Sequence, residues 1–526
     1  MTEPNRIVII GAGHNGLVCA AYLARAGCKV LVLEASSRVG GAAITREFAP
    51  GFKVSAGAHL LHLLDPTVQR DLGLDRHGFA IVRKHLRTVA LSESAPALVL
   101  DGAKVISGAL SATDRAALTR HHRRMRRFAA VMAKQHGRVP ARLASPDWRD
   151  ALSAIALALD IRRLGRKNMR EFLRVATMNI FDILEDTFES PQLKGALALD
   201  GVLGARLGPR SGNTVFTSLY RASGSVDGRA GACALPRGGM GSVSEALASA
   251  ARAAGVEIRT ATPVASVILD ADRVTGVRLE SGAEISADIV VSNADPKTTL
   301  LRLLGARHLE TEFARRVHNI RMHGYAAKLH LALSDLPQFG GVATEHLGER
   351  LLIAPDLEYI EHAFNPAKYR EYSERPVLEI TLPSMHDASL APTGQHVLSA
   401  VVQYAPYDLA GGWDANRERF REVVLSALER FAPGLRRQVV AAELLTPLDI
   451  EREFRITGGH WHHGELTLDQ FMMLRPVPGA QQYVMPVRGL YMCGAGCHPG
   501  GGVMGTAGRN AAGAILKNTS VKGPRP

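Results

Sequence analysis

The chain has 526 residues, which is enough for about two to four domains with substantial cores. Its five cysteines follow no regular spacing, which argues against a small secreted protein stapled by disulfides. Lys and Arg outnumber Asp and Glu by 63 to 50, a net charge of +13, but no aromatic-interleaved basic motif accompanies this charge, so we expect no nucleic-acid partner.

The first segment has the pattern of a strand, a glycine-rich turn and a helix. An apolar run at residues 7–10 precedes the turn, and an Ala- and Leu-rich stretch follows it to about Arg25. Glycines in such a turn allow tight bending, close approach of the backbone to a pyrophosphate, and close packing of the helix on the strand. The helix N-terminus offers its unpaired N–H groups to the anion. The segment therefore predicts a dinucleotide site whose turn consists of Gly11, Ala12, Gly13, His14, Asn15 and Gly16.

The residues after the second predicted strand (30–33) indicate which dinucleotide binds. Glu34 lies eighteen residues after Gly16, where its carboxylate can accept a hydrogen bond from a ribose hydroxyl. A carboxylate here would repel a 2′-phosphate, which argues against NADP. A glycine pair follows, which alone would be typical of an ordinary turn. At this fixed distance from Glu34 it favours FAD, which would contact Glu34, Ala35, Arg38, Gly40 and Gly41.

A third part of the same site is expected near the C-terminus. A short apolar strand (489–493) is followed by a Gly- and Pro-rich loop (494–502) and a helix that starts near Val503. The positive end of that helix would stabilise negative charge on a reduced flavin. The expected flavin contacts are Gly494, Gly501, Gly502, Val503 and Met504.

No second complete Gly-x-Gly-x-x-Gly follows a strand, so we expect no separate NAD(P)H domain. Electrons would then come from an organic substrate and leave to oxygen, a quinone or a carrier protein.

The FAD-binding domain is predicted to be built from three separated pieces of the chain. These are residues 1–105, 235–297 and 456–517. Between them lie two insertions, 106–234 (mainly helical) and 298–455 (mixed), which would form a substrate domain. Within the first insertion the pattern predicts helices at 112–136, 149–163, 167–188 and 190–200. Residues 518–526 are expected to be a disordered tail.

In five blocks of sequence the chain resembles the phytoene-desaturase-related FAD oxidoreductases. The resemblance is greatest to the branch called pyridine nucleotide-disulfide oxidoreductase domain-containing protein 2, and it rests on residues 7–45, 189–204, 235–258, 456–479 and 489–512. It implies an α/β fold: a glutathione-reductase-type FAD-binding Rossmann domain with an inserted mixed α+β substrate domain. It also implies that Val264 meets the adenine through its backbone, although an ordinary strand valine explains this residue equally well.

Four residues are candidates for catalysis. The resemblance places His59 where the chain returns to the flavin, and it places His463, Glu465 and Arg475 near the active site. A histidine or a carboxylate there could accept or relay a proton. Judged from the sequence alone, however, a histidine such as His59 is more often a packed or surface residue. His460, His462, His463 and Glu465 do not have the spacing of a known zinc motif, so we expect no metal.

The expected function is dehydrogenation of a small hydrophobic organic substrate by hydride transfer to flavin N5. Two alternatives remain open. The first is a flavin amine oxidase, which would need an aromatic pair beside the flavin. The second is a flavin-bound interaction protein with vestigial activity.

The expected location is the cytoplasm. The N-terminus shows no signal peptide, and no uncharged run reaches the ~18 residues of a membrane span. A basic run at residues 121–128 is typical of a solvated helix face, and peripheral contact with an anionic membrane is the alternative. The sequence carries no indication of oligomeric state.

Overall fold

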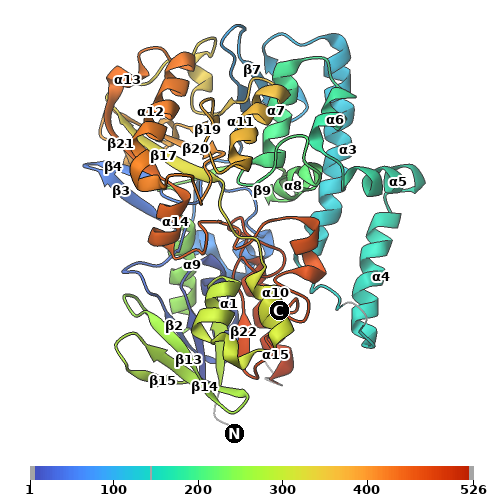
Figure 1. The fold of residues 1–526 in the computed structure, drawn as a ribbon, viewed down its shortest axis with the longest axis vertical. Coiled ribbons are helices and arrows are strands. Elements are labelled where there is room, and N and C mark those ends of the chain that lie inside the picture. Colours follow the sequence, from blue (N-terminus) through green and yellow to red (C-terminus); the bar gives the residue numbers. More distant parts are fainter. Residues whose placement is uncertain (1–5, 143–144, 520–526) are drawn as a thin grey trace.

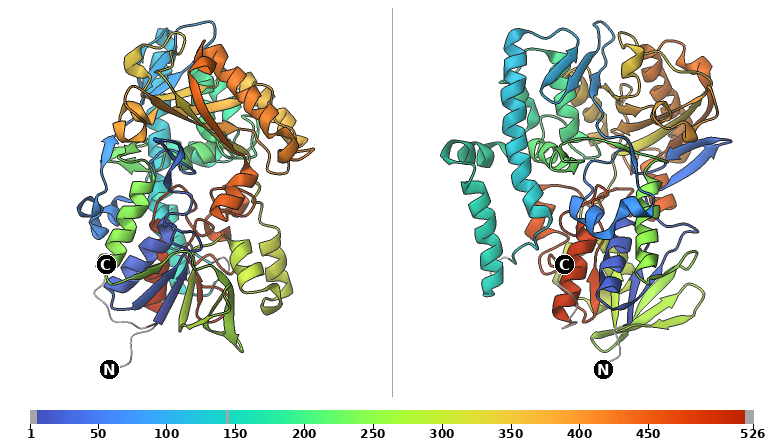
Figure 2. Two further views of the ribbon diagram at one scale, coloured as in Figure 1. Left: turned by 90° about the vertical axis from the view of Figure 1, so that its left-hand side faces the viewer. Right: turned by 180° about the vertical axis from the view of Figure 1, so that it is seen from behind.

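Two β-sheets organise the chain, one toward each end of the molecule (Figure 1). The structure is a computed structural model, and it describes residues 6–142 and 145–519. Most of the expected tail, residues 520–526, lies outside the described residues. Residues 6–10 and the C-terminal helix both lie at the end that holds the smaller of these two sheets (Figures 1 and 2).

The smaller sheet is parallel throughout and has five strands. Its residues are almost continuously apolar, and Ile7, Val8 and Ile9 are fully buried, as expected for a sheet covered on both faces. Helices α1 (His14–Arg25), α9 (Gly241–Ala253) and α15 (Thr506–Asn518) accompany it, and α1 packs against both others. The strand order is β12 (Glu257–Arg259), β2 (Lys29–Leu33), β1 (Arg6–Ile10), β16 (Ile289–Ser292) and β22 (Leu490–Met492).

A three-stranded antiparallel sheet links β12 to β16. It consists of β13 (Val264–Asp270), β14 (Arg273–Leu279) and β15 (Glu284–Ser286). Asp270 pairs with Arg273 across the turn between β13 and β14. The parallel sheet therefore draws its strands from the three separated parts of the chain that the sequence pattern indicates.

The larger sheet has eight strands, antiparallel except where β18 pairs with β6. Most of its central residues are buried, and helices cover it (Figure 1). The order is β21 (Val439–Leu445), β17 (Ala326–Leu333), β20 (His396–Gln403), β19 (Val377–Thr381), β18 (Arg350–Ile353), β6 (Thr88–Ala90), β7 (Leu98–Asp101) and β8 (Lys104–Ser107).

The boundary expected at residue 105 needs correction. Strands β6, β7 and β8 span residues 88–107 and pair into the larger sheet, so this part of 1–105 does not join the parallel sheet. The sequence of a short apolar strand does not indicate which sheet the strand will join, because its pairing partner depends on distant residues. The other domain limits stay predictions.

Helices fill most of the first insertion. They are α3 (Ala112–His136), α4 (Trp148–Arg162), α5 (Arg166–Val175), α6 (Ile180–Glu185), α7 (Pro191–Val202) and α8 (Thr214–Arg221). The segment 167–188, predicted as one helix, is two helices, because the Asn179 side chain accepts a hydrogen bond from the Asp182 N–H and starts α6 anew.

The remaining elements are short or lie in the second insertion. None of the helices in the described part of the chain is long and apolar enough to cross a membrane. The helices are α2 (Pro66–Leu72), α10 (Thr311–His318), α11 (Leu357–Lys368), α12 (Trp413–Phe431), α13 (Leu435–Gln438) and α14 (Pro447–Phe454), and the strands are β3 (Thr45–Ala49), β4 (Phe52–Ser55), β5 (Ile81–Arg83), β9 (Ser225–Val226), β10 (Arg229–Ala230) and β11 (Leu235–Pro236).

Candidate active site

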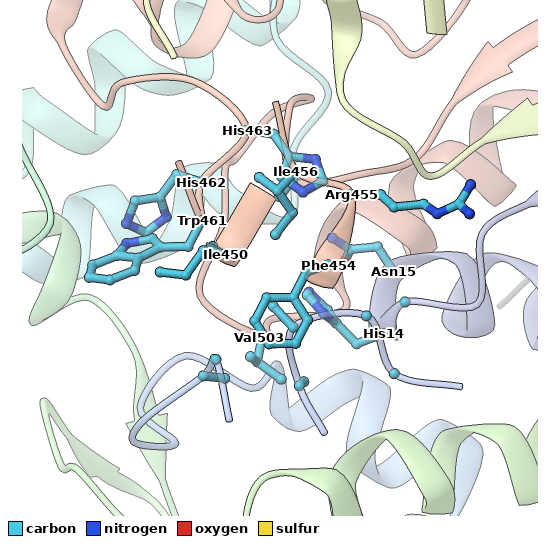
Figure 3. A pocket seen from close by; sticks show the side chains of 18 of the residues that line it. His14, Asn15, Ile450, Phe454, Arg455, Ile456, Trp461, His462, His463 and Val503 are labelled. Atoms are coloured by element: carbon cyan, nitrogen blue, oxygen red, sulfur yellow. The ribbon is translucent and has the colours of Figure 1, made fainter. Parts of the chain in front are cut away.

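A cavity of about 430 Å³ extends from the carboxyl edge of the parallel sheet to the larger sheet. On one side it is lined by residues that follow β1, β2 and β16. On the other it is lined by Glu379 on β19 and Val401 on β20. Figure 3 shows side chains from the start of α1, including His14 and Asn15, and from residues 450–463 around one shared space.

The floor of the cavity at the start of α1 is bare backbone. A Cβ atom on Gly13 would lie 2.6 Å from Nδ2 of Asn293, and one on Gly41 would lie 3.6 Å from Cα of Gly13. A Cβ atom on Gly16 would lie 2.3 Å from the carbonyl oxygen of Gly11, so Gly16 is what allows α1 to pack against the end of β1. A backbone floor at a helix N-terminus fits the pyrophosphate of a dinucleotide.

Two polar side chains at the same helix end have unpaired atoms. Both polar atoms of the buried Asn15 amide and Nε2 of His14 lack a hydrogen-bond partner among the described residues. Because buried polar groups are nearly always paired, such atoms in a cavity wall are suited to contact a ligand. Burial, and then the nearby His463, lowers the pKa of His14 to about 4, so this ring is neutral near pH 7.

Glu34 is fixed at the cavity wall by two backbone groups. Its Oε2 accepts a hydrogen bond from the Ala12 N–H at 2.7 Å, and its Oε1 accepts one from the Ser36 N–H at 2.8 Å. Each carboxylate oxygen can accept a further hydrogen bond, so the group remains able to bind a ribose hydroxyl. Arg38, also in the wall, is exposed.

The C-terminal loop closes the cavity from the other side of β16. Helix α15 begins at Thr506, three residues later than predicted, because Gly502, Val503 and Gly505 have φ of +125°, +55° and +77°. Left-handed backbone at a β-branched residue such as Val503 is strained, and strain of this kind is concentrated at functional sites. Gly502 and Val503 both line the cavity.

The structure brings most of the residues singled out in the sequence to this cavity. Those that line it are Gly11, Gly13, His14, Asn15, Glu34, Ala35, Arg38, Gly40, Gly41, His59, Val264, His463, Gly502 and Val503.

The other residues singled out support the wall or point elsewhere. A Cβ atom on Gly494 would lie 2.5 Å from the Asn293 carbonyl oxygen. The Gly501 carbonyl accepts a hydrogen bond from the Tyr220 hydroxyl at 2.7 Å. The residues that do not line the main cavity are Ala12, Gly16, Gly494, Gly501, Met504, Glu465 and Arg475.

Arg475 clamps the loop that carries His463. Its guanidinium is buried and donates hydrogen bonds to five carbonyl oxygens, including those of His462 at 2.5 Å and Ala495 at 2.9 Å. Burial lowers the pKa of Arg475 to about 10. The side chain thus ties residues 462–470 to the C-terminal loop and does not face the cavity.

Glu465 turns away from the cavity. Its carboxylate accepts a hydrogen bond from Nε of Arg321 at 2.8 Å. His463, by contrast, lines the cavity with Nδ1 unpaired among the described residues. Burial lowers the pKa of His463, although Asp295 opposes the shift. Of the two, only His463 is placed to meet a ligand.

His59 is paired with a lysine that the sequence pattern does not single out. Nζ of Lys328, on β17, lies 2.7 Å from Nδ1 of His59 and donates a hydrogen bond to Oγ of Ser399 at 3.2 Å. Burial lowers the pKa of Lys328 to about 7, although Glu379 opposes the shift. Burial, and then Lys328, also holds the pKa of His59 well below its usual value. Near neutral pH this buried pair can therefore gain or lose a proton.

A network of four charged residues lies at the wall nearest the larger sheet, and three of them, Asp200, Arg221 and Glu379, line the cavity. Oε2 of Glu379 accepts hydrogen bonds from Nη2 of Arg221 and Nε of Arg350, each at 2.5 Å. Asp200 pairs with the same two arginines. Although burial opposes it, Arg221 and Arg350 hold the pKa of Glu379 far below its usual range. Asp200, whose side chain is 33% exposed, is the most accessible of the four.

A family assignment agrees with this geometry. Residues 16–516 match the model of the family described as flavin containing amine oxidoreductase. The chain belongs to this family. Its cofactor is therefore FAD, for which the backbone floor, Glu34 and the C-terminal loop form a fitting site.

Full-length relatives bear out the expected branch. The chain is 38% identical to pyridine nucleotide-disulfide oxidoreductase domain-containing protein 2 of Rattus norvegicus, over 97% of this chain and 93% of the relative. It is 27% identical to a subunit of limonene dehydrogenase from Castellaniella defragrans, with 97% and 94% covered. It is 25% identical to the lycopene-forming phytoene desaturase of Pantoea ananas, with 97% and 99% covered. The resemblance inferred from the sequence blocks is thus confirmed.

The fold is shared with the solved structure of an oxidase. Cyclohexylamine oxidase from Brevibacterium oxydans superposes with a TM-score of 0.57 at 17% identity, over 98% of this chain and all of the other. The predicted α/β class, with an FAD domain and a substrate domain, is confirmed. The family match shows that the protein is an FAD-dependent oxidoreductase. Among residues 6–142 and 145–519, no three His, Cys, Asp or Glu side chains are arranged to hold a metal ion.

Proposed function

We propose that this oxidoreductase dehydrogenates a hydrophobic organic substrate in the part of the cavity beside His59. The observation that carries the proposal is the continuity of the cavity, which runs from the dinucleotide floor to the larger sheet without interruption. FAD, when bound, supplies the hydride acceptor at its N5 atom, and the electrons then pass to oxygen, a quinone or a carrier protein.

The residues proposed to hold FAD come from all three pieces of the parallel sheet. The backbone at Gly11 and Gly13 would face the pyrophosphate, and Glu34 the ribose. Val264 and the strained Val503 lie in the same wall and would contact the rest of the cofactor. Arg475 would act as a positioning residue, because it fixes the loop that carries His463.

Apolar side chains that lie in the cavity wall beside the charged network support an apolar substrate. Burying apolar substrate surface against these side chains is favourable by roughly 25 cal/mol for each Å² removed from water. Relatives named for limonene and phytoene support the same class. The apolar side chains in this wall are Leu60, Leu203, Val401, Ile450 and Leu466.

Proton handling is assigned to His59 and Lys328. Nε2 of His59 has no partner among the described residues, and its ring is neutral. When Nδ1–H of this ring donates to the neutral amine of Lys328, Nε2 is free to accept the proton that leaves the substrate. Lys328, at 2.7 Å from Nδ1, would hold the ring and exchange its own proton near neutral pH. His463 is a second candidate on the opposite loop.

An anaerobic titration tests the proposal. Purified protein with FAD is mixed with cyclic alkenes, longer polyenes and saturated terpenoids, and the flavin absorbance is recorded. At least one of these should bleach the flavin, and His59→Gln should slow bleaching about a hundredfold without loss of FAD. His362→Gln, on an exposed helix face, is the matched control and should react at the normal rate. Flavin that only dithionite can reduce would contradict the proposal and support vestigial activity.

Amine oxidation is the second candidate, and Asp200 is the observation that favours it. Its accessible carboxylate lines the cavity and could pair with a substrate ammonium group. Tyr220 and Trp461 also line the cavity, although each ring contacts His462 and not the other ring. Bleaching by primary or secondary amines but by no hydrocarbon, weakened in Asp200→Asn, would replace the hydrophobic substrate with an amine.

A further inference from the structure

Helix α4 turns its polar face toward the protein. Asp150, near the start of the helix, accepts hydrogen bonds from Nε of Arg142 at 2.9 Å and from Nε2 of Gln482 at 2.7 Å. Asp160, near its end, accepts one from Nζ of Lys134 at 3.1 Å. Both residues are buried: the exposed fraction is 6% for Asp150 and 2% for Asp160. A surface helix normally buries its apolar face, so this orientation is inverted.

The outward face of α4 is apolar. Four large side chains follow one another at helical spacing, and each is about half exposed or more: Trp148 (65%), Leu152 (53%), Ile155 (52%) and Leu159 (44%). Helix α4 stands at the outer edge of the molecule, where nothing else in the described part of the chain covers this stripe (Figures 1 and 2). Contiguous exposed apolar stripes of this kind mark interaction surfaces.

The charges around this stripe are almost all positive. Residues 145–174 contain seven basic side chains and four acidic ones, which gives a net charge of +3. None of the four acidic residues is exposed, because Asp150 and Asp160 are buried and Asp147 and Glu171 are half-buried. All seven basic residues are exposed: Arg149, Arg162, Arg163, Arg166, Lys167, Arg170 and Arg174.

We propose that helices α4 and α5 form an arm that binds the surface of an anionic lipid membrane. An apolar stripe bordered by exposed Arg and Lys is the pattern of a helix that lies in the plane of a lipid interface. Trp148, at the N-terminal end of the stripe, has the amphipathic ring favoured at that depth. A second copy of the chain is disfavoured as the occupant, because it would bring two positively charged arms together.

The proposal places the membrane contact on a different segment from the basic run at 121–128. That run lies within α3, where His121 and Phe128 are buried against the protein. The arm is also separate from the residues that line the active-site cavity, so the proposal does not depend on the reaction.

Sedimentation with vesicles tests the arm in the full chain with FAD bound. The probes are vesicles of phosphatidylcholine alone and of phosphatidylcholine with one third phosphatidylglycerol. The protein should pellet with the second kind only, and it should be released at high salt. Leu152→Ser with Ile155→Ser should weaken binding about tenfold or more. Tyr369→Ser with Val440→Ser removes side chains that are as exposed but lie off the arm, and it should change nothing.

Two further measurements separate charge from folding. Arg163→Gln, Arg166→Gln and Lys167→Gln should each weaken binding to the anionic vesicles about fivefold. The fluorescence of Trp148 should shift to the blue on binding, and Trp148→Phe should lose that shift while still pelleting, with an unchanged circular dichroism spectrum. The other two tryptophans lie away from the arm, because Trp413 is buried and Trp461 lines the cavity, so a shift on vesicle binding reports on Trp148.

Two outcomes would overturn the proposal. The first is failure of the unaltered protein to pellet with anionic vesicles. The second is an oligomer, seen by analytical ultracentrifugation, that the Leu152 and Ile155 changes dissociate while vesicle binding stays the same. The second result would assign the stripe to a second copy of the chain.

Discussion

Lys328 stands in an apolar strand, and its burial favours the neutral amine over the ammonium ion. Its partner His59 is buried too, and both groups are close to the cavity where a substrate would lie. A base is most effective when its pKa is near the working pH, and the pKa of Lys328 is about 7. These two residues therefore link cavity chemistry to solution pH.

Replacing Lys328 by Met should change the pH dependence of flavin reduction. If the neutral amine is the active form, the rate in the unaltered protein rises as pH increases through about 7, because the ammonium form is lost there. Lys328→Met should lower the rate by roughly a hundredfold and remove this rise. Stopped-flow reduction between pH 6 and 9 measures both, with the exposed Lys53→Met as control. A rise near pH 7 that survives in Lys328→Met would contradict the role.

The residue patterns predicted the cofactor side of the cavity better than the substrate side. Gly13, Gly16 and Glu34 act through local geometry at fixed spacing, which the sequence displays directly. Lys328 could have been noticed as a lone charge within the apolar run 326–333. Its pairing with His59 could not, because 269 residues separate the two and only the packing of the sheets brings them together.

At the scale of elements, the contact between β1 and α1 depends on the absence of one side chain. Gly16 lies so close to the Gly11 carbonyl oxygen that no Cβ atom fits between them. Gly513, by contrast, lies in α15, and nothing lies within 4 Å of the position that a Cβ atom would take there. The two glycines therefore have opposite roles in helices that pack against each other.

Ala substitutions should separate these roles. Gly16→Ala should force α1 away from β1, reduce bound FAD and lower the thermal midpoint, at a cost of roughly 1–3 kcal/mol for overpacking. Gly513→Ala should leave FAD binding intact and stabilise α15 by about 0.5–1 kcal/mol, because Ala restricts the unfolded chain. Flavin absorbance per protein and thermal unfolding measure both. Equal FAD content in the two variants would contradict the packing argument.

Most elements of the FAD domain follow from hydrophobic periodicity and turn chemistry. Two helix boundaries that the sequence pattern did not predict have local causes, which compete with hydrophobic periodicity. Asn179 caps a new helix within 167–188, and left-handed backbone at Val503 delays the start of α15. The position of β6, β7 and β8 in the larger sheet has no such local cause. It depends on the pairing of β6 with β18, which lies more than 240 residues further along the chain.

For the whole molecule, buried histidines with lowered pKa values contribute to the loss of stability in acid. Six have pKa values lowered by burial to about 3 or 4, compared with about 6.5 in an unfolded chain. The folded state therefore binds fewer protons than the unfolded state between these values. The six histidines are His14, His62, His121, His136, His460 and His498.

The free energy of unfolding should accordingly fall as pH drops from about 6.5 toward 4. Each such histidine contributes up to about 1.4 kcal/mol per pH unit within this window. Thermal midpoints followed by circular dichroism at pH 7.5, 6 and 5 should fall steadily. His121→Gln should make the fall shallower, and His362→Gln, whose side chain is 76% exposed, should not. A midpoint that stays constant down to pH 5 would contradict the prediction.

The sequence order of the strands in the parallel sheet has a consequence for folding during synthesis. The ribosome synthesises the glycine turn at residues 11–16 well before β22 and the strained loop at Val503. Strands β1 and β2 therefore remain without the complete sheet while the residues between Leu33 and Leu490 are translated. Flavin capture should follow synthesis of β22 and the Val503 loop, and nascent chains stalled before residue 490 should retain no FAD.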